Sequence, residues 1–244
     1  MKMKSILKLF VIFLSLILPL HAKVSKVLWS IKTGKEIDGS PCIWDGKVYF
    51  GSKDSFFYCV DAISGKIIWK TETGTWVDSS PCIWDGKVYF GSRDSYLYCL
   101  DAATGEIIWK FQTADDINSS PCIWDGKVYF GSYDKNIYCL DAISGDFVWS
   151  IKADHFIYSS PCVWDGKVYF GSYDKNIYCL DAISGNTFWK LKTGDKIASS
   201  PCIWDGKVYF GSDDGKLYCI DAGTPGMKGV SFPSISGMDT MIEK

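Results

Sequence analysis

Apolar residues in this chain stand in short runs that are separated by two or three turn-forming residues. Between residues 80 and 113, four such runs are divided by Asp-Gly at 85–86, Arg-Asp-Ser at 93–95 and Ala-Thr-Gly at 103–105. An Asp-Gly pair between two apolar runs is a strong signal for a tight hairpin, because both of its positions favour positive φ. No window shows the 3.6-residue period of a helix. The pattern therefore predicts four antiparallel strands, at 80–84, 87–92, 96–102 and 107–113.

The predicted strands are apolar on both of their alternating faces. Val88 and Phe90 point to one side of the expected sheet, and Tyr89 points to the other. A sheet of this kind has to be covered on both sides. Four-stranded units that pack radially around an axis, with sheets about 10 Å apart, meet that requirement.

The same unit occurs five times at a spacing of 40 residues. The twelve-residue block Pro-Cys-Ile-Trp-Asp-Gly-Lys-Val-Tyr-Phe-Gly-Ser starts at Pro41, Pro81, Pro121, Pro161 and Pro201, and Val163 is its one variation. A period of this length indicates a stacked or radial array. A linear stack would need capping repeats with a polar outer side, and the sequence shows none. We therefore predict an all-β fold, a β-propeller of five four-stranded antiparallel blades.

The position of a repeated Trp indicates how the ring closes. In the first four copies a Trp follows the Asp of the third strand by eight residues, as Trp69 follows Asp61, but the fifth copy has Gly229 at that place. The missing strand matches residues 27–31, because Trp29 lies 40 residues before Trp69. We expect this N-terminal strand to complete the last blade, which would leave no open sheet edge.

The two ends of the chain differ in composition from the repeats. Lys2, Lys4 and Lys8 precede an apolar stretch over residues 9–20, a pattern that is typical of a signal peptide. The apolar stretch is too short to span a bilayer. An uncleaved anchor is the alternative. We predict a signal peptide at 1–22, the propeller at 23–222 and an irregular tail at 223–244. The protein is then exported, and is periplasmic or extracellular.

The net charge narrows the range of partners. Without the signal peptide, 23 Lys and Arg residues stand against 28 Asp and Glu residues, a net charge of about −5. Nucleic acids and anionic membranes are bound by basic surfaces. We therefore expect neither as the main partner, and no membrane span in the mature chain.

The repeat resembles that of the pyrroloquinoline-quinone (PQQ) propeller superfamily. The shared features are Gly-Ser-x-Asp, as at 91–94, Tyr-Cys-Leu-Asp-Ala-x-Thr-Gly, as at 98–105, and Trp109 four residues after that Gly. The resemblance covers residues 25–222 and includes the quinoprotein dehydrogenases and the outer-membrane assembly scaffold lipoprotein, which usually have eight blades. Five blades leave open a small ring, a truncated larger ring or closure through a second chain. The resemblance also implies that the repeated Trp docks on the neighbouring blade, at Trp29, Trp69, Trp109, Trp149 and Trp189.

The same resemblance bears on catalysis. The dehydrogenases hold PQQ with a pair of adjacent Cys residues, a stacking Trp and a carboxylate-bound Ca²⁺. In this sequence no two Cys residues are adjacent, no copy has its own carboxylate and Asn set, and His155 is the one His after residue 22. We therefore expect no enzymatic activity, no cofactor and no metal site. A PQQ-dependent dehydrogenase fragment is the alternative.

The ten Cys residues lie two per blade, at the positions of Cys42 and Cys59. An even number of Cys residues in an exported chain would suggest disulfides. Within one blade, however, a whole strand separates the two positions, so their Cα atoms stand about 9.6 Å apart, whereas a disulfide needs about 7 Å or less. We expect buried free thiols. The sequence leaves bridges between blades open.

Specialised chemistry can lie only where the copies differ. The first and third turns of each blade are nearly uniform, whereas the second turn and the link between blades vary. Alternate turns of a meander lie at alternate ends of the sheet, so the variable segments should share one face, where loops on a rigid scaffold commonly bind partners. The middle residue of each link is Ile or Val, and its neighbours should point the other way. These neighbours are the candidate binding residues: Glu36, Asp38, Trp76, Asp78, Asp116, Asn118, Phe156, Tyr158 and Lys196.

Aromatic side chains beside carboxylates suit a sugar, a peptide or a cationic partner. We expect a binding or scaffolding module at the cell envelope, monomeric, with a protein or glycan partner on the variable loops. A carbohydrate-binding propeller is the alternative. Drift of solvent-exposed loops after duplication would also produce this variation.

Overall fold

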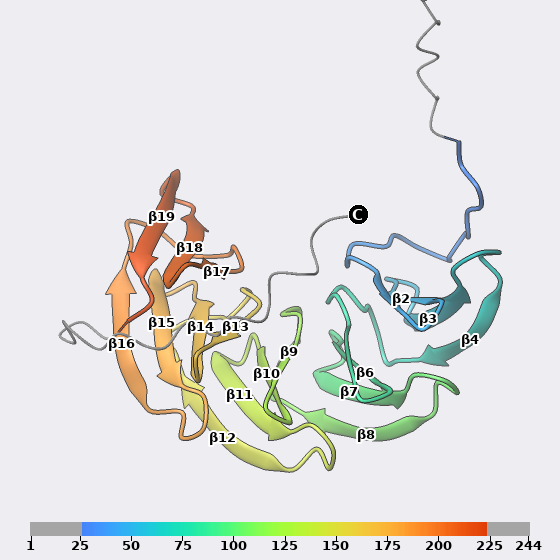
Figure 1. The fold of residues 1–244 in the computed structure, drawn as a ribbon, viewed down its shortest axis with the longest axis horizontal. Helices are drawn as coiled ribbons and strands as arrows, with labels where there is room; N and C mark the ends of the chain where they lie inside the picture. Colours follow the sequence, from blue (N-terminus) through green and yellow to red (C-terminus); the bar gives the residue numbers. More distant parts are fainter. Residues whose placement is uncertain (1–25, 224–244) are drawn as a thin grey trace, which may run out of the picture. The chain divides into compact units, whose positions relative to one another are not determined.

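The regular structure of the chain consists of β-strands. The computed structural model describes residues 26–223, so the predicted signal peptide and nearly all of the predicted tail lie outside the described residues. The chain separates into two units, residues 1–30 and 31–244, and the strands belong to the second. They form five antiparallel sheets in which neighbours in sequence are neighbours in the sheet (Figure 1). The predicted all-β, five-bladed propeller is confirmed, and residues 26–223 contain no helix that could span a membrane.

Each sheet is one blade of the predicted propeller. Blade 1 consists of β1 (Cys42–Trp44), β2 (Lys47–Gly51), β3 (Phe56–Asp61) and β4 (Ile67–Glu72). Blade 2 consists of β5 (Cys82–Trp84), β6 (Lys87–Gly91), β7 (Tyr96–Asp101) and β8 (Ile107–Gln112). Blade 3 consists of β9 (Cys122–Trp124), β10 (Lys127–Gly131), β11 (Asn136–Asp141) and β12 (Phe147–Lys152). Blade 4 consists of β13 (Cys162–Trp164), β14 (Lys167–Gly171), β15 (Asn176–Asp181) and β16 (Thr187–Lys192), and blade 5 of β17 (Cys202–Trp204), β18 (Lys207–Ser212) and β19 (Lys216–Asp221).

The two uniform turns of each blade lie side by side, as the sequence predicts. In blade 1, Asp45 and Gly46 have φ values of 48° and 68°, the positive values that a two-residue hairpin turn needs. In the third turn, Asp61 accepts hydrogen bonds at its Oδ1 from the amide N and the Oγ of Ser64, at 2.7 and 2.6 Å. The amide N of Ala62 donates to the carbonyl O of Gly46 at 2.9 Å, which ties the two turns together.

Alternate residues of each strand face the two neighbouring blades. In blade 2, Val88 and Phe90 pack against blade 1, whereas Tyr89 and Leu97 pack against blade 3. The ring of Phe90 stacks on that of Phe57 in blade 1 with 4.0 Å between the ring centroids. Full burial of such a side chain contributes about 1.5–3 kcal/mol. The hydrophobic core therefore lies between the blades, and the predicted burial of both sheet faces is confirmed in the interior blades.

A glycine at the end of the second strand lets the next link approach closely. A Cβ on Gly91 would overlap the side chain of Ile117, which is fully buried in the link that follows blade 2. We call such a glycine a socket, because the apolar middle residue of the next link occupies the space beside it. The same contact joins Gly51 to Val77, Gly131 to Ile157 and Gly171 to Ile197. These contacts explain why the middle residue is apolar in the links that follow blades 1 to 4.

The last blade differs from the sequence-based prediction. Its sheet has three strands, and residues 26–31, where the fourth strand was expected, form no strand. Exposure of Val27 and Leu28 is not the cause, because Ile67 and Ile68 at the same positions of the blade 1 strand are also exposed; residues 26–31 differ in that they do not belong to any of the five sheets. The innermost strands of consecutive blades contact one another, but within the described part of the chain β1 and β17 do not. The described residues therefore do not form the predicted closure by an N-terminal strand.

Candidate functional site

Backbone hydrogen bonds join the two variable segments of each blade. In blade 2 the amide N of Arg93, in the second turn, donates to the carbonyl O of Trp76, in the link, at 2.9 Å. The equivalent bonds run from Lys53 to Glu36, from Tyr133 to Asp116, from Tyr173 to Phe156 and from Asp213 to Lys196, at 2.9–3.0 Å. We call the surface formed by these links and second turns the variable face. It carries all nine candidate binding residues.

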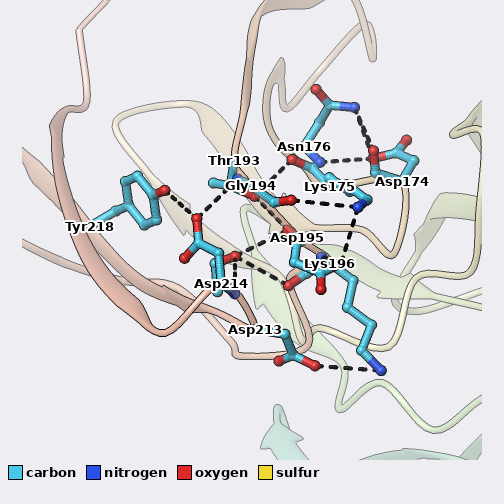
Figure 2. A network of polar contacts seen from close by, with 11 residues as sticks. Asp174, Lys175, Asn176, Thr193, Gly194, Asp195, Lys196, Asp213, Asp214 and Tyr218 are labelled. Carbon is cyan, nitrogen blue, oxygen red and sulfur yellow. Dashed lines mark hydrogen bonds and ion pairs between the residues drawn. The ribbon is translucent and has the colours of Figure 1, made fainter.

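A carboxylate in the second turn fixes the link of the same blade. In blade 5, shown in Figure 2, Asp214 accepts hydrogen bonds at its Oδ2 from the hydroxyl of Tyr218 at 2.6 Å and the amide N of Gly194 at 2.9 Å. The bond from Tyr218 is the main cause of a pKa for Asp214 that is lowered to about 2. The same Asp–Tyr pair occurs in every blade, at Asp54, Asp94, Asp134 and Asp174. The variable face therefore rests on an invariant polar frame.

The side chains of the two variable segments form a pair within each blade. The link residue that follows the apolar middle residue contacts the first residue that varies in the second turn. The pairs are Asp38 with Lys53 at 2.6 Å, Asp78 with Arg93 at 2.7 Å, Asn118 with the Tyr133 hydroxyl at 3.0 Å, and Tyr158 with Tyr173 at 6.2 Å between ring centroids. In blade 5, which has Ala198 at the link position, Lys196 pairs instead with Asp213 at 3.4 Å (Figure 2). The variation between copies is thus coordinated across two separate segments.

Trp76 is the centre of a charged group at the blade 1 and blade 2 end of the variable face. The cationic groups of Arg93, Lys53 and Lys35 lie 4.9, 5.3 and 5.7 Å from the centroid of its ring. Each such cation–π contact contributes about 0.5–1 kcal/mol at an exposed site. Two of these cations also form the ion pairs described above, so the Trp76 ring is held in a network of alternating charge.

An aromatic group occupies blades 3 and 4 on the same face. The rings of Tyr133 and Phe156 stack with 5.1 Å between centroids and 10° between planes. Tyr158 lies 6.1 Å from Tyr133 and 6.2 Å from Tyr173, and His155 lies 4.6 Å from Phe156. Tyr158 and His155 are exposed, and the other three rings are partly so. Clustered rings with free faces and edges bind apolar, planar or ring-shaped ligand groups.

Two buried acceptors lie at equivalent link positions between these groups. Asp78 Oδ1 and Asn118 Oδ1 are buried and have no hydrogen-bond partner among the described residues. Leaving a buried acceptor unpaired costs about 1–3 kcal/mol. Nearby, burial raises the pKa of the Asp116 carboxyl and the neighbouring Asp115 adds to that effect, while Arg93 opposes it. Both unpaired atoms lie beneath the surface, so they are a local cost to stability and not an exposed part of the variable face.

The structure places the nine candidate residues at different depths. Glu36, Asp38 and Tyr158 are exposed, Asn118 is buried, and Trp76, Asp78, Asp116, Phe156 and Lys196 are half-buried. Sequence reasoning did not include the turn residues among the candidates, although Lys53, Arg93, Tyr133 and Tyr173 supply half of the contacts. Their signal in the sequence is the fixed spacing of 15 residues from the link positions 38, 78, 118 and 158.

The repeated Trp residues of the fourth strands contact the following blade. Trp69 lies against Gly105, where an added Cβ would stand 2.6 Å from the indole ring. Each indole N–H donates to a carbonyl of the next blade: Trp69 to Ala102, Trp109 to Ala142, Trp149 to Ala182 and Trp189 to Gly223, at 3.1–3.3 Å. Trp29, the N-terminal residue of this series, is half-buried. These contacts give the Trp residues a structural role between blades.

The cysteines are free thiols in different environments. The third-strand cysteines of blades 1 to 4 are buried, and burial raises the pKa of Cys59 to about 11 and that of Cys99 to about 12. Cys202 and Cys219 in blade 5 are exposed, so the expectation of burial is wrong there, because no further blade covers them. Across residues 26–223, no group of His, Cys, Asp and Glu side chains is arranged to hold a metal ion.

Five antiparallel sheets with a uniform Asp–Tyr frame and interblade Trp contacts define a β-propeller built from PQQ-like repeats. Residues 20–224 match the family model described as outer membrane protein assembly factor BamB. The chain belongs to this family.

Solved structures of similar fold come from three kinds of protein. BamB from Moraxella catarrhalis is 22% identical with a TM-score of 0.72, over 81% of this chain and 62% of that one. The computationally designed protein Ika8 is 16% identical with a TM-score of 0.68, over 74% of this chain and 57% of that one. The quinohemoprotein alcohol dehydrogenase ADHIIG from Pseudomonas putida HK5 is 20% identical with a TM-score of 0.67, over 80% of this chain and 41% of that one. Identities this low show the fold alone, and this chain spans less than two thirds of each of these proteins. In the comparison with curated proteins, nothing matches.

Proposed function

We propose that the protein is an exported, non-enzymatic module that binds or scaffolds a protein partner at the cell envelope through the variable face. Membership of the BamB family supports a role in protein assembly. The apolar stretch preceded by lysines at residues 1–22 supports export. The observation that carries the proposal is the concentration of side-chain variation on one face of a scaffold that is otherwise repeated almost without change.

The chemistry of the variable face favours a peptide segment with both polar and apolar groups. The charged group presents Lys35, Lys53 and Arg93 around Trp76, which suits carboxylates or carbonyl oxygens of a partner. The aromatic group offers a surface for apolar side chains. A protein segment provides both kinds of group within a short length.

Removal of one aromatic anchor from each group tests this proposal. We expect Trp76→Ala combined with Phe156→Ala to weaken partner binding by about 30-fold or more, because aromatic anchors of this kind often contribute over 2 kcal/mol. The measurement is the amount of partner retained from envelope extract, compared between wild type and variant at equal loading. A melting temperature close to that of wild type would show that the loss comes from the surface.

The matched control changes two Trp residues at the opposite ends of the strands. Trp44 and Trp164 stand beside the uniform Asp-Gly turns and are each 40% exposed. Trp44→Ala with Trp164→Ala should leave partner retention unchanged. Equal losses from both double variants, or loss only from the control, would contradict the assignment of binding to the variable face.

A glycan is the second candidate ligand, and the aromatic group is the observation that favours it. Tyr158 is 41% exposed and has Tyr133 and Tyr173 on either side, an arrangement that suits stacking against a sugar ring. Tyr158→Ala would then abolish binding to immobilised glycans, while Lys53→Ala would not. A protein partner that also contacts the charged group would be weakened by both changes.

A further inference from the structure

Blades 1 and 5 are the first and last of the series in Figure 1, so each has one apolar face that no neighbouring blade covers among the described residues. In blades 2 to 4 the corresponding faces lie against neighbouring blades. We call the face of blade 5 that points away from blade 4 the trailing face. We call the face of blade 1 that points away from blade 2 the leading face. The trailing face carries Cys202, Tyr209, Gly211, Leu217 and Cys219, and the leading face carries Ile37, Ile43 and Val48.

The trailing face is exposed, although the residues at the same positions of the preceding blades belong to the hydrophobic core. Leu217 is 79% exposed, whereas the residues at its position in the four preceding blades are fully buried: Phe57, Leu97, Ile137 and Ile177. Cys219 is exposed, and its equivalents Cys59, Cys99, Cys139 and Cys179 are buried. In the interior blades it is the next blade that covers these positions.

The leading face is exposed at Ile37 and Ile43, whereas Phe50, Tyr58 and Val60 on the same face are buried. Ile37 is 42% exposed, whereas its equivalents Val77, Ile117, Ile157 and Ile197 are fully buried against the preceding blade. Ile43 is 70% exposed, while its equivalents Ile83, Ile123, Val163 and Ile203 pack into the interblade clusters. The chain therefore carries one half of an interblade contact at each end.

The exposed part of the leading face matches the trailing face at the socket glycine. In each of the first four blades a socket glycine is filled by the apolar residue of the next link, as Ile117 fills the space beside Gly91. Gly211 is the fifth socket, and the nearest atom to a Cβ there is the Oγ of Ser199 at 3.6 Å, so the space is open. Ile37 is the matching link residue, and in this chain it has no preceding blade to enter.

We propose that two copies of this chain associate head to tail, with the leading face of one copy packed on the trailing face of the other. Ile37 of the second copy then occupies the space beside Gly211, and Ile43 of the second copy packs near Leu217. The repeats are nearly identical, so this contact reproduces an interface that the chain already forms four times between its own blades. It is heterologous, because each copy contributes a different face, and such contacts lead to rings or to filaments.

The open edge of blade 5 supports the same arrangement. The sheet of blade 5 ends at β19, whereas blades 1 to 4 add a fourth strand outside the third. An unpaired edge is a template for strand addition. Residues 27–31 lie 40 positions before the fourth strand of blade 1, so those of a second copy have the sequence spacing of the missing strand. The expectation of a monomer assumed that one chain closes its own ring, and head-to-tail association replaces it.

The first test is the mass of the purified protein in sedimentation velocity over a micromolar concentration series. We expect a mass of at least two chains that increases with concentration. Leu217→Asp and Ile43→Asp should each reduce it to one chain at every concentration, because each places a charge in the contact. Ile63→Asp, at a site that is 89% exposed in a uniform turn, is the matched control and should associate like wild type.

Mixing the two single variants separates head-to-tail association from other modes. Leu217→Asp keeps an intact leading face, and Ile43→Asp keeps an intact trailing face, so an equimolar mixture should form a complex of two chains and nothing larger. If Leu217→Asp fails to fold, Gly211→Val serves in its place, because it fills the open socket without a clash inside blade 5. A wild type of one-chain mass, a mixture that stays at one-chain mass, or dissociation by Ile63→Asp would each overturn the proposal.

Thiol accessibility distinguishes a second copy from a segment of the same chain on the trailing face. In a head-to-tail complex, Cys202 and Cys219 should react more slowly with a thiol reagent as protein concentration rises. Protection that is equal at all concentrations would show that the chain covers its own trailing face, and full reactivity at all concentrations would show that nothing covers it. Either result contradicts association through this face.

Discussion

Leu97 and Leu217 occupy the same position in blades 2 and 5 but have different surroundings. Leu97 is 0% exposed and packs in one cluster with Ile117, in the link before blade 3, and Phe130, in blade 3. Leu217, in contrast, is 79% exposed. The two residues lie on the same strand of the repeat and face in the same direction. Substitution of each by Ala therefore measures what the following blade contributes to stability, with local sequence held nearly constant.

The two substitutions should differ severalfold in their effect on the free energy of unfolding. Truncation of a fully buried Leu costs about 2–5 kcal/mol. For a domain of this size each kcal/mol lowers Tm by about 2–4 °C, so Leu97→Ala should lower Tm by roughly 4–20 °C. Leu217→Ala removes few contacts and should stay within about 0.5 kcal/mol of wild type, a Tm change of about 2 °C or less.

Thermal unfolding followed by circular dichroism measures both values. The protein should be diluted until sedimentation gives one-chain mass, so that contacts between copies do not contribute. Equal destabilisation by the two substitutions would refute this reasoning, because it would show that the trailing face is buried in a single chain, as in a closed ring of five blades. A negligible effect of Leu97→Ala would refute the assignment of the core to the space between blades.

Two further predictions concern the thiols and the carboxylates of the third turns. In dilute native protein, Cys202 and Cys219 should react with a thiol reagent far faster than the other cysteines. Burial raises the pKa of the other thiols, as it raises that of Cys179 to about 11. Unfolding should expose all ten, and rapid loss of more than two thiols in the native state would contradict the burial pattern. Hydrogen bonds from the Ser or Thr three residues later lower the pKa of Asp61, Asp101, Asp141 and Asp181, so the folded state binds fewer protons than the unfolded one in acid. The resulting stabilisation is complete above the carboxyl pKa in the unfolded chain, about 3.9, and is lost as pH falls through the lower pKa values of the folded state. Tm should therefore be level from about pH 7 to 5 and should fall below about pH 4. An unchanged Tm in acid would count against this prediction.

The strands and turns could be predicted from the sequence because each is determined locally. The Asp-Gly pair at 85–86 requires positive φ at both positions, and the structure has it in every blade. The alternation of Val88, Tyr89 and Phe90 assigns each side chain to one of two sheet faces, and both faces are buried in the interior blades. The grouping of uniform turns at one end of the strands follows from the meander alone.

The environment of the end blades could not be predicted in the same way, because the repeats are nearly identical in sequence. Cys219 and Cys179 have similar local sequences, yet one is exposed and the other buried. The difference arises from the presence or absence of a following blade. Burial of a repeat depends on its neighbours, and no feature within the repeat reports them.

The pairing of side chains on the variable face could not be predicted from the sequence either. The links could be recognised as variable, but the contacts of Asp78 with Arg93 and of Asn118 with Tyr133 join segments that lie 15 residues apart. The register of the turn against the link sets these pairs, and the backbone bond from Arg93 to Trp76 fixes that register. A search for differences that change together at this spacing would have found the turn residues.

We expect the variable face and the end faces to serve separate contacts, because of the charges that would meet at the junction between copies. Within the chain, three second-turn residues also meet the link of the next blade: Lys53 meets Trp76, Tyr133 stacks on Phe156, and Tyr173 lies 4.7 Å from the ammonium group of Lys196. In the head-to-tail complex the same spacing would bring Asp213 of one copy to Glu36 of the next. Two carboxylates at an exposed rim do not attract each other, so the line of side-chain contacts on the variable face ends within each copy. If both proposals hold, association depends on the apolar end faces and partner binding on residues of a single chain, so the variants that remove one should leave the other intact.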